Sequence, residues 1–146
     1  MIQINFDLTH DQVMRTMIDL TRPSILHRII LAGSDSAVAE LDLRRRGFLR
    51  ISTTSRSTPR GQYAVGLITG QHSLQALAEA VTEISAFLSA AAAIAIVIDF
   101  RAAGSNLKVR EQLERLGFQI EAGVRCHEQF LLSARRRNFS HMTNAA

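Results

Sequence analysis

The sequence contains one cysteine and one lysine, and each scarcity excludes a class of site or partner. With Cys126 alone, the chain forms no internal disulfide and lacks the several thiolates of a typical structural zinc site. The histidines share no metal-ligand spacing, so we predict no metal site. Because Lys108 is the only lysine, the net charge of +4 comes from arginine. That modest positive charge permits an acidic partner without requiring one.

Long apolar runs are also lacking. The longest uncharged apolar stretch, residues 84–98, is shorter than the roughly 20 residues that span a bilayer, so we expect no membrane partner. The first residues do not form a basic and then apolar leader, and with the single cysteine this predicts a cytoplasmic location. A chain of 146 residues with 47% hydrophobic residues suffices for one core. We therefore predict a single domain over residues 1–134.

The first eight residues alternate between apolar and polar side chains. This period of two runs from Ile2 to Leu8 and predicts an extra strand over residues 1–8 with one wet face. At a sheet edge its free backbone groups would pair either with a second copy, giving a homodimer, or with another strand of the same chain. Thr9 and Gln12 then have the capping-box spacing, so we expect a helix near residues 10–20.

After Pro23 the chain alternates between strand and helix patterns. Apolar runs predict strands at residues 29–32, 48–53, 63–69, 94–98, 118–122 and 130–134. Three helices are expected between them: one carrying Val38 and Leu41, one with a stripe from Leu74 to Leu88, and one beginning at Ser105 or Asn106. This order predicts an α/β, Rossmann-like three-layer sandwich with a mainly parallel sheet and a C-terminal antiparallel hairpin.

The C-terminal residues are basic and have little apolar surface. Residues 135–146 offer mainly Phe139 and Met142 for burial, so we expect a mobile basic tail. A nucleic-acid-binding surface is one alternative function for the arginines outside the predicted helices. Its phosphate contacts would be Arg56, Arg60, Arg135, Arg136 and Arg137.

The order of these elements resembles the class I S-adenosylmethionine-dependent methyltransferase fold. The resemblance covers about Pro23 to Arg136, and its second half ends in a helix, the Gly117-Phe118 step and a terminal hairpin. In that family a glycine-rich turn after the first strand approaches the cofactor, and an acid ending the second strand binds its ribose. The resemblance therefore implies cofactor contacts at Gly33, Asp35 and Thr53, if the site is retained.

Several parts of the family's cofactor site are absent. Asp35 and Ala37 stand where further glycines are expected, and Thr53 stands where the ribose-binding acid is expected. About eight residues after Thr53 are too few for a further helix and strand. We interpret the chain as a non-catalytic methyltransferase-like domain with a binding, assembly or regulatory role and no expected cofactor. The alternative is a divergent S-adenosylmethionine-dependent methyltransferase.

Three further residues follow predicted strands at the edge where such sheets bind ligands. They are His72, Asp99 and Arg101. His72 has a side chain that can act as a base near neutral pH, although its neighbour Ser73 is as well suited to capping the next helix. Asp99 can equally cap the turn after its strand. We therefore assign these residues to a ligand edge and assign no catalytic residue.

Overall fold

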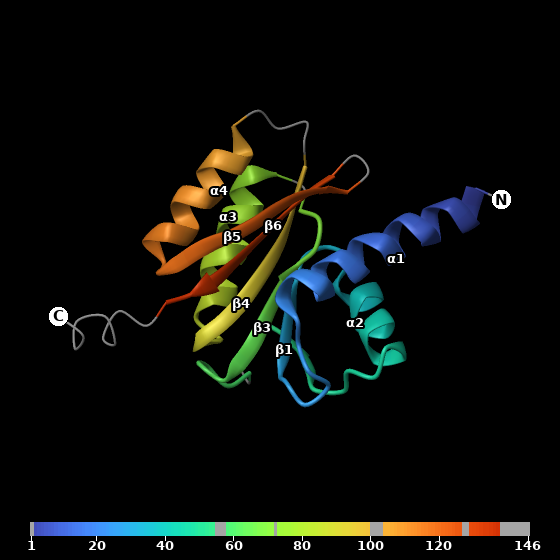
Figure 1. Cartoon of the computed structure of the whole chain (residues 1–146), viewed down its shortest axis with the longest axis horizontal. Coiled ribbons are helices and arrows are strands. Elements are labelled where there is room, and N and C mark those ends of the chain that lie inside the picture. The colour runs from blue at the N-terminus through green and yellow to red at the C-terminus, as the bar shows by residue number, and fades with distance from the viewer. Residues whose placement is uncertain (1, 55–57, 72, 100–103, 127–128, 138–146) are drawn as a thin grey trace.

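A computed structural model describes residues 2–54, 58–71, 73–99, 104–126 and 129–137. Figure 1 shows a single sheet with helices on both of its faces. The described elements, in chain order, are α1 (Ile2–Thr21), β1 (Ile29–Ala32), α2 (Ser36–Arg45), β2 (Ile51–Thr53), β3 (Tyr63–Ile68), α3 (Leu74–Ser85), β4 (Leu88–Asp99), α4 (Ser105–Arg115), β5 (Phe118–Cys126) and β6 (Gln129–Arg136).

The strands form one sheet in the order β2-β1-β3-β4-β6-β5. The first four in this order are mutually parallel, and β6 runs antiparallel to both β4 and β5. Leu67 of β3 pairs with Leu31 on one side and with Ala95 on the other, so β1, β3 and β4 are neighbours as predicted. The mainly parallel sheet with its terminal antiparallel hairpin is confirmed.

Two clusters of buried hydrophobic residues lie between the sheet and its helices, one on each face. Successive strand residues point to opposite faces, so Ile29 and Leu31 join α1 and α2, whereas Ile30 joins α3 and α4. On the first face α1 contributes Met14 and Met17, both essentially buried. The result is a three-layer sandwich with α1 and α2 on one side of the sheet and α3 and α4 on the other.

The N-terminal segment is helical, so the predicted strand over residues 1–8 is wrong. The alternation is a strand pattern, because residues two apart lie on opposite sides of a helix, yet the segment is helical. A helix pairs its backbone N–H and C=O groups within the segment, whereas a strand here would need a partner strand. The homodimer predicted through that strand therefore loses its basis.

Two other expectations about helices also fail. The predicted stripe from Leu74 to Leu88 is too long, because α3 ends at Ser85 and Leu88 already pairs with Tyr63 of β3. The alanines that follow favour helices by propensity, but buried sheet packing overrides this preference. Val38 and Leu41 of α2 are more than half exposed, and α2 packs through residues one and two positions further on, Ala39 and Leu43.

The predicted tail begins too early in the chain. The guanidinium of Arg136 donates to the backbone oxygens of Leu88 at 2.9 Å and Ser85 at 3.0 Å, and it lies 4.7 Å from the centre of the Phe118 ring. Burial lowers the pKa of Arg136, yet an arginine stays charged at neutral pH. The Arg137 amide donates to the Gly117 oxygen. The domain thus extends to Arg137, and residues 138–146 lie outside the described part.

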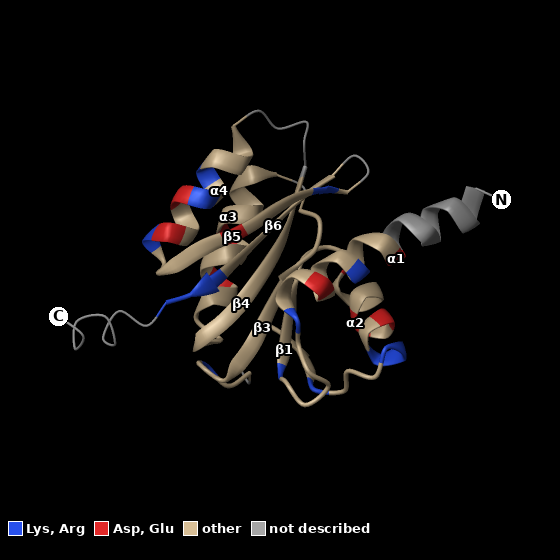
Figure 2. Ribbon diagram, in the orientation of Figure 1, with Lys and Arg blue, Asp and Glu red and all other residues tan. Residues whose placement is uncertain are grey.

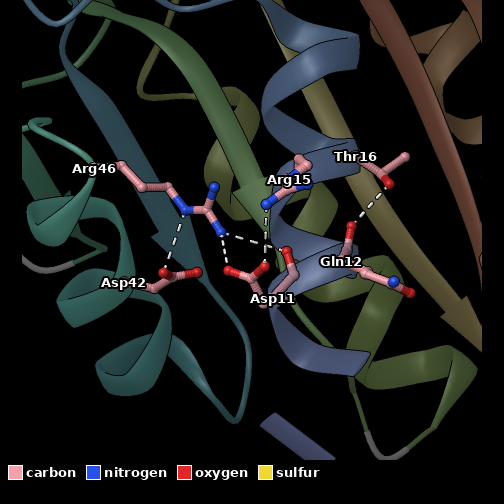
Figure 3. Close-up of polar contacts among 6 residues, drawn as sticks. All are labelled: Asp11, Gln12, Arg15, Thr16, Asp42 and Arg46. Atoms are coloured by element: carbon pink, nitrogen blue, oxygen red, sulfur yellow. Dashed lines mark hydrogen bonds and ion pairs between the residues drawn. The ribbon is translucent and has the colours of Figure 1, made fainter. Parts of the chain in front are cut away.

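An ionic network fixes α1 beside α2 (Figure 3). Arg46, just after α2, donates from Nη2 to both the carboxylate and the backbone oxygen of Asp11 in α1. Its Nε donates to Asp42 Oδ1 at 3.2 Å, and Arg15 approaches the same Asp11 carboxylate at 3.6 Å. One partly buried guanidinium therefore joins carboxylates from two helices, and this contact holds the α1 and α2 layer together.

Candidate functional site

The carboxyl ends of β1, β2 and β3 meet at one edge of the sheet. Leu31 pairs with Thr53 of β2, and Ala32 pairs with Ile68 of β3, so the turns after these strands are neighbours. In open α/β sheets, ligands bind outside the carboxyl ends of the strands. This edge therefore holds the candidate site, and Gly33, Asp35 and Thr53 all lie at it.

Gly33 forms the turn after β1. Its φ of +123° lies in a region that side chains with a Cβ rarely adopt. A Cβ at this position would come within 2.8 Å of the Thr69 backbone oxygen and would overlap the Thr69 hydroxyl. The glycine is therefore required by the close approach of this turn to the end of β3, whether or not a ligand is present.

Ser34 ties the turn after β1 to the turn after β3. Its backbone N–H donates to the Gly70 oxygen at 3.2 Å, and its hydroxyl donates to the same oxygen at 2.8 Å. Sequence reasoning missed this pair, because a serine beside a glycine predicts a turn and does not reveal its partner 36 residues away. These two bonds hold the turn after β1 against the turn after β3.

The N-terminus of α2 opens toward this edge. Asp35 occupies the N-cap position, but its side chain makes no capping hydrogen bond and is exposed. In contrast, Ser73 caps α3 by accepting from the Ala76 amide at 3.0 Å, which confirms the capping role considered for it. The Ser36 amide donates to the Gly33 oxygen at 3.4 Å, and the next amides of α2 have no side-chain cap from Asp35. With the helix dipole these amides make a positive end beside the Gly33 turn.

Thr53 ends β2 with an exposed side chain. Its backbone oxygen accepts from the Thr58 hydroxyl at 2.9 Å, so Thr58 lies close to the end of β2. The described residues of this connection contain no helix, in agreement with the predicted loss of a helix and a strand. A threonine hydroxyl can still bond a ribose hydroxyl, but without the charge assistance of a carboxylate.

The remaining predicted ligand-edge residues are only partly covered. His72 and Arg101 lie outside the described residues, and of Asp99 the structure describes only the backbone that ends β4. The described part of the chain contains no cluster of His, Cys, Asp or Glu suited to a metal ion. Cys126 ends β5 and packs half-buried against the core on the α1 face.

A groove of about 860 Å³ lies between α3 and α4, away from the predicted site residues. Its lining combines the apolar side chains of Leu74, Ala78 and Leu116 with carboxylates on both helices. No strand residue contributes to this lining, which differs from the strand-end location of the ligand edge. We therefore place the candidate site at the ends of β1, β2 and β3.

Several arginines assigned to nucleic acid already have contacts within the chain. Arg60 lies over the Phe87 ring at 5.9 Å, Arg135 approaches Glu121 at 3.6 Å, and Arg136 is committed to backbone oxygens. Arg56 lies outside the described residues, and Arg137 is exposed. Within the described chain, no helix has both the length and the apolar character needed to cross a bilayer.

Comparison with known proteins gives structural neighbours only. No protein-family model and no curated protein sequence matches the chain. A 1,6-didemethyltoxoflavin-N1-methyltransferase from Burkholderia thailandensis is 14% identical with a TM-score of 0.57, covering 86% of this chain and 78% of its own. A precorrin-6y C5,15-methyltransferase from Geobacter metallireducens is 13% identical with a TM-score of 0.60, covering 87% and 88%.

One neighbour has a different chemistry in its name. The cyclase SpnF is 13% identical with a TM-score of 0.61, covering 87% of this chain and 80% of its own. Likeness at such low identity establishes a shared architecture and leaves the reaction open. The sheet order, the terminal hairpin and these neighbours together show that the chain has the Rossmann-type fold of class I S-adenosylmethionine-dependent methyltransferases.

Proposed function

We propose that the chain is a divergent methyltransferase-type domain that binds S-adenosylmethionine or S-adenosylhomocysteine at the ends of β1, β2 and β3. The carrying observation is the Gly33 turn, which leads directly into the uncapped N-terminus of α2. Structures of two neighbours, a 1,6-didemethyltoxoflavin-N1-methyltransferase and a magnesium protoporphyrin IX methyltransferase, contain S-adenosylhomocysteine and S-adenosylmethionine respectively. These neighbours fit a divergent methyltransferase at least as well as the non-catalytic interpretation.

The residues present fit this cofactor in part. The first amides of α2 would bind its methionine carboxylate, because a helix N-terminus combines free N–H donors with a positive dipole end. The exposed Thr53 hydroxyl would bind a ribose hydroxyl. When bound, S-adenosylmethionine would supply a transferable methyl group. The chain's own contribution at this edge is binding and orientation.

Two features predict that this binding is weak. A hydrogen bond to a charged group contributes about 1.5–3 kcal/mol, so a threonine in place of the ribose-binding acid costs roughly 10–150-fold in affinity. The exposed carboxylate of Asp35 lies at the same helix end as the proposed carboxylate contact, and like charges there repel. Both effects act on affinity and leave the site's location unchanged.

A second candidate is a non-catalytic domain with a binding, assembly or regulatory role. The observation that favours it is the double hydrogen bond from Ser34 to the Gly70 oxygen. This contact closes the turns after β1 and β3 against each other, at the place where a cofactor would reach the strand ends. Under this proposal the fold is a scaffold whose partner binds elsewhere.

Calorimetric titration of the purified full chain with S-adenosylmethionine and with S-adenosylhomocysteine tests the first proposal. We expect one-to-one binding in the high micromolar range or weaker. Thr53→Asp should tighten it by roughly 10–150-fold, because it restores a charged ribose ligand. Ser24→Asp is the matched control and should leave affinity unchanged. Ser24 is also exposed but lies in the loop before β1, at the opposite end of the sheet, and an aspartate there can still accept the Leu26 amide.

The Asp35 carboxylate provides an independent arm of this test. Asp35→Asn removes the charge while keeping the size of the side chain, so it should also tighten binding of the cofactor carboxylate. Failure of the natural chain, Thr53→Asp and Asp35→Asn to bind either nucleoside at millimolar concentration would reject the cofactor site. That result would move the non-catalytic candidate to first place.

A further inference from the structure

The opposite edge of the sheet, where β1, β2 and β3 begin, is rich in arginine. The segments that lead into these strands cover residues 22–28, 44–50 and 58–62, the second of which includes the last two residues of α2. These segments contain no aspartate or glutamate. Arg44 and Arg46 are paired with acids of the helices. Within the described chain, five arginines at this edge have no acidic partner: Arg22, Arg28, Arg45, Arg50 and Arg60.

Three exposed aliphatic side chains lie among these arginines. Ile25 is 60% exposed, Leu26 69% and Leu49 67%. The two loops that carry them are in contact, because the Ile29 amide donates to the Arg50 oxygen, and a Cβ on Gly47 would lie 3.7 Å from the Ile25 side chain. We call these three residues and the five arginines the basic-apolar edge. Figure 2 shows basic segments at the start of β1 and at the end of α2 that belong to it.

Helix-end electrostatics do not account for the whole edge. The carboxyl ends of α1 and α2 lead into the first two of these segments, and the end of α3 lies against the third, where the Gly61 amide donates to the Ala86 oxygen. Each helix end carries about half a negative charge. The five guanidinium groups of the basic-apolar edge exceed that charge and leave the edge positive. Arg22 also holds a left-handed backbone, with φ of +50°, directly after α1, a position that glycine fills without strain. Neither helix dipoles nor packing explains why exposed aliphatic side chains accompany these charges.

We propose that the basic-apolar edge docks on the surface of an anionic lipid bilayer. Arginines would contact lipid phosphates and carboxylates, while Ile25, Leu26 and Leu49 would enter the interfacial region. This is peripheral contact without a spanning segment, and it departs from our expectation of no membrane partner. It is also separate from the proposed cofactor edge at the other end of the strands.

The buried aromatic rings favour lipid over nucleic acid as the occupant. Phe48, Tyr63 and Phe87 adjoin this edge but are 7%, 3% and 6% exposed, so they offer no face on which a base could stack. A phosphate backbone would use the arginines alone and would leave the aliphatic side chains in water. An anionic bilayer uses both kinds of side chain, because its interface is charged outside and apolar beneath.

Co-sedimentation of the full chain with vesicles tests this proposal. The vesicles are phosphatidylcholine alone and phosphatidylcholine with about 30% phosphatidylglycerol. We expect binding only to the anionic vesicles, falling as salt rises from about 50 to 500 mM. Arg50→Gln should weaken binding about fivefold, which corresponds to about 1 kcal/mol per charge near the surface. Leu26→Ser and Leu49→Ser should each weaken it by roughly fivefold or more through lost apolar burial.

Matched controls come from α4, on a different part of the molecule. Lys108→Gln removes an exposed charge and Leu107→Ser removes a 62% exposed leucine, and neither should change vesicle binding. Circular dichroism would verify that every variant is folded. Equal loss in the α4 variants would show nonspecific attraction and would overturn the proposal.

Two other outcomes would also overturn it. If Leu26→Ser converts a dimer into a monomer by light scattering while vesicles are not bound, the edge is an interface between copies. If a short RNA or DNA duplex binds, Arg50→Gln weakens that binding, and vesicles are not bound, the edge is a nucleic-acid surface. Vesicle binding that is lost in both the arginine and the leucine variants supports the lipid assignment.

Discussion

At the scale of single residues, Gly33 carries the sharpest structural requirement. We expect Gly33→Ala to destabilise the domain by about 2–4 kcal/mol, from backbone strain at φ +123° and overlap with Thr69. Gly70→Ala is the control, because a Cβ there meets nothing within 4 Å. Urea unfolding of both variants measures the difference. Equal stability of the two would mean that the turn relaxes and that Gly33 is dispensable.

Arg46 provides a second test at residue scale. Replacing it with Gln should lower the free energy of unfolding by about 2 kcal/mol, because partly buried carboxylates of Asp11 and Asp42 lose a charged donor. Arg45→Gln, the exposed neighbour without an acidic partner in the described chain, should change stability by less than about 0.5 kcal/mol. Thermal unfolding of the pair measures this contrast. Similar effects of both substitutions would deny the network a role in stability.

Some residues of the candidate site were predictable from the sequence, and the contacts of others were not. The resemblance to the methyltransferase fold implied Gly33 and Thr53 as site residues, and both lie at one edge because parallel strands end together. The bonds from Ser34 to Gly70 could not be predicted, since they depend on how two distant turns approach in space. Whether Asp35 caps α2 was equally hidden, because the same residue type occurs at caps with and without the capping bond.

At the scale of elements, sequence patterns predicted the second half of α1 as a helix and its first half wrongly as a strand. The helix expected near residues 10–20 is present, and its Val13 and Met17 are buried against the sheet. The capping box expected at Thr9 and Gln12 is wrong, because α1 already begins at Ile2. The first half of α1 was misread because alternation favours a strand, whereas a helix satisfies its backbone groups without needing a partner strand. The start of β4 was misread for a related reason, since alanine-rich segments favour helices until tertiary packing decides.

The packing of α1 leads to a prediction about this element. Met17→Ala should cost about 2–4 kcal/mol, because Met17 is fully buried between α1 and the sheet. Arg15→Ala, on the exposed side of the same helix, should cost less than about 1 kcal/mol, since it loses only an exposed ion pair. Denaturant midpoints of both variants provide the measurement. A small effect of Met17→Ala would indicate that α1 does not stay docked on the sheet.

At the scale of the whole molecule, the order of elements was the most predictable property. Alternating strand and helix patterns leave few topologies, because crossovers between parallel strands are right-handed and short. The terminal hairpin was expected from two adjacent apolar runs, although β5 and β6 are both longer than expected and Gly123, which suggested a turn, pairs with Leu132 inside β5. The sequence could not reveal that Arg136 bonds to the folded domain, because its acceptors are backbone oxygens that no sequence pattern marks.

The end of the domain gives the last prediction. Chains ending at Arg137 and at Ala134 both lack residues 138–146, so their comparison isolates Arg135, Arg136 and Arg137. The shorter chain loses two charged hydrogen bonds to the Leu88 and Ser85 oxygens and the contact with Phe118. We expect it to be less stable by about 2–4 kcal/mol, since charged hydrogen bonds contribute most and their partial exposure reduces the sum.

Urea unfolding of the two truncated chains measures this difference directly. An Arg136→Gln substitution in the chain ending at Arg137 should reproduce most of the loss, because Arg136 makes the side-chain contacts at this end of β6 with Ser85, Leu88 and Phe118. Trypsin should cleave the folded protein more slowly after Arg136 than the unfolded protein, since β6 is paired on both sides. Equal stability of the two truncated chains would instead place the end of the domain at Ala134, where the sequence pattern had put it.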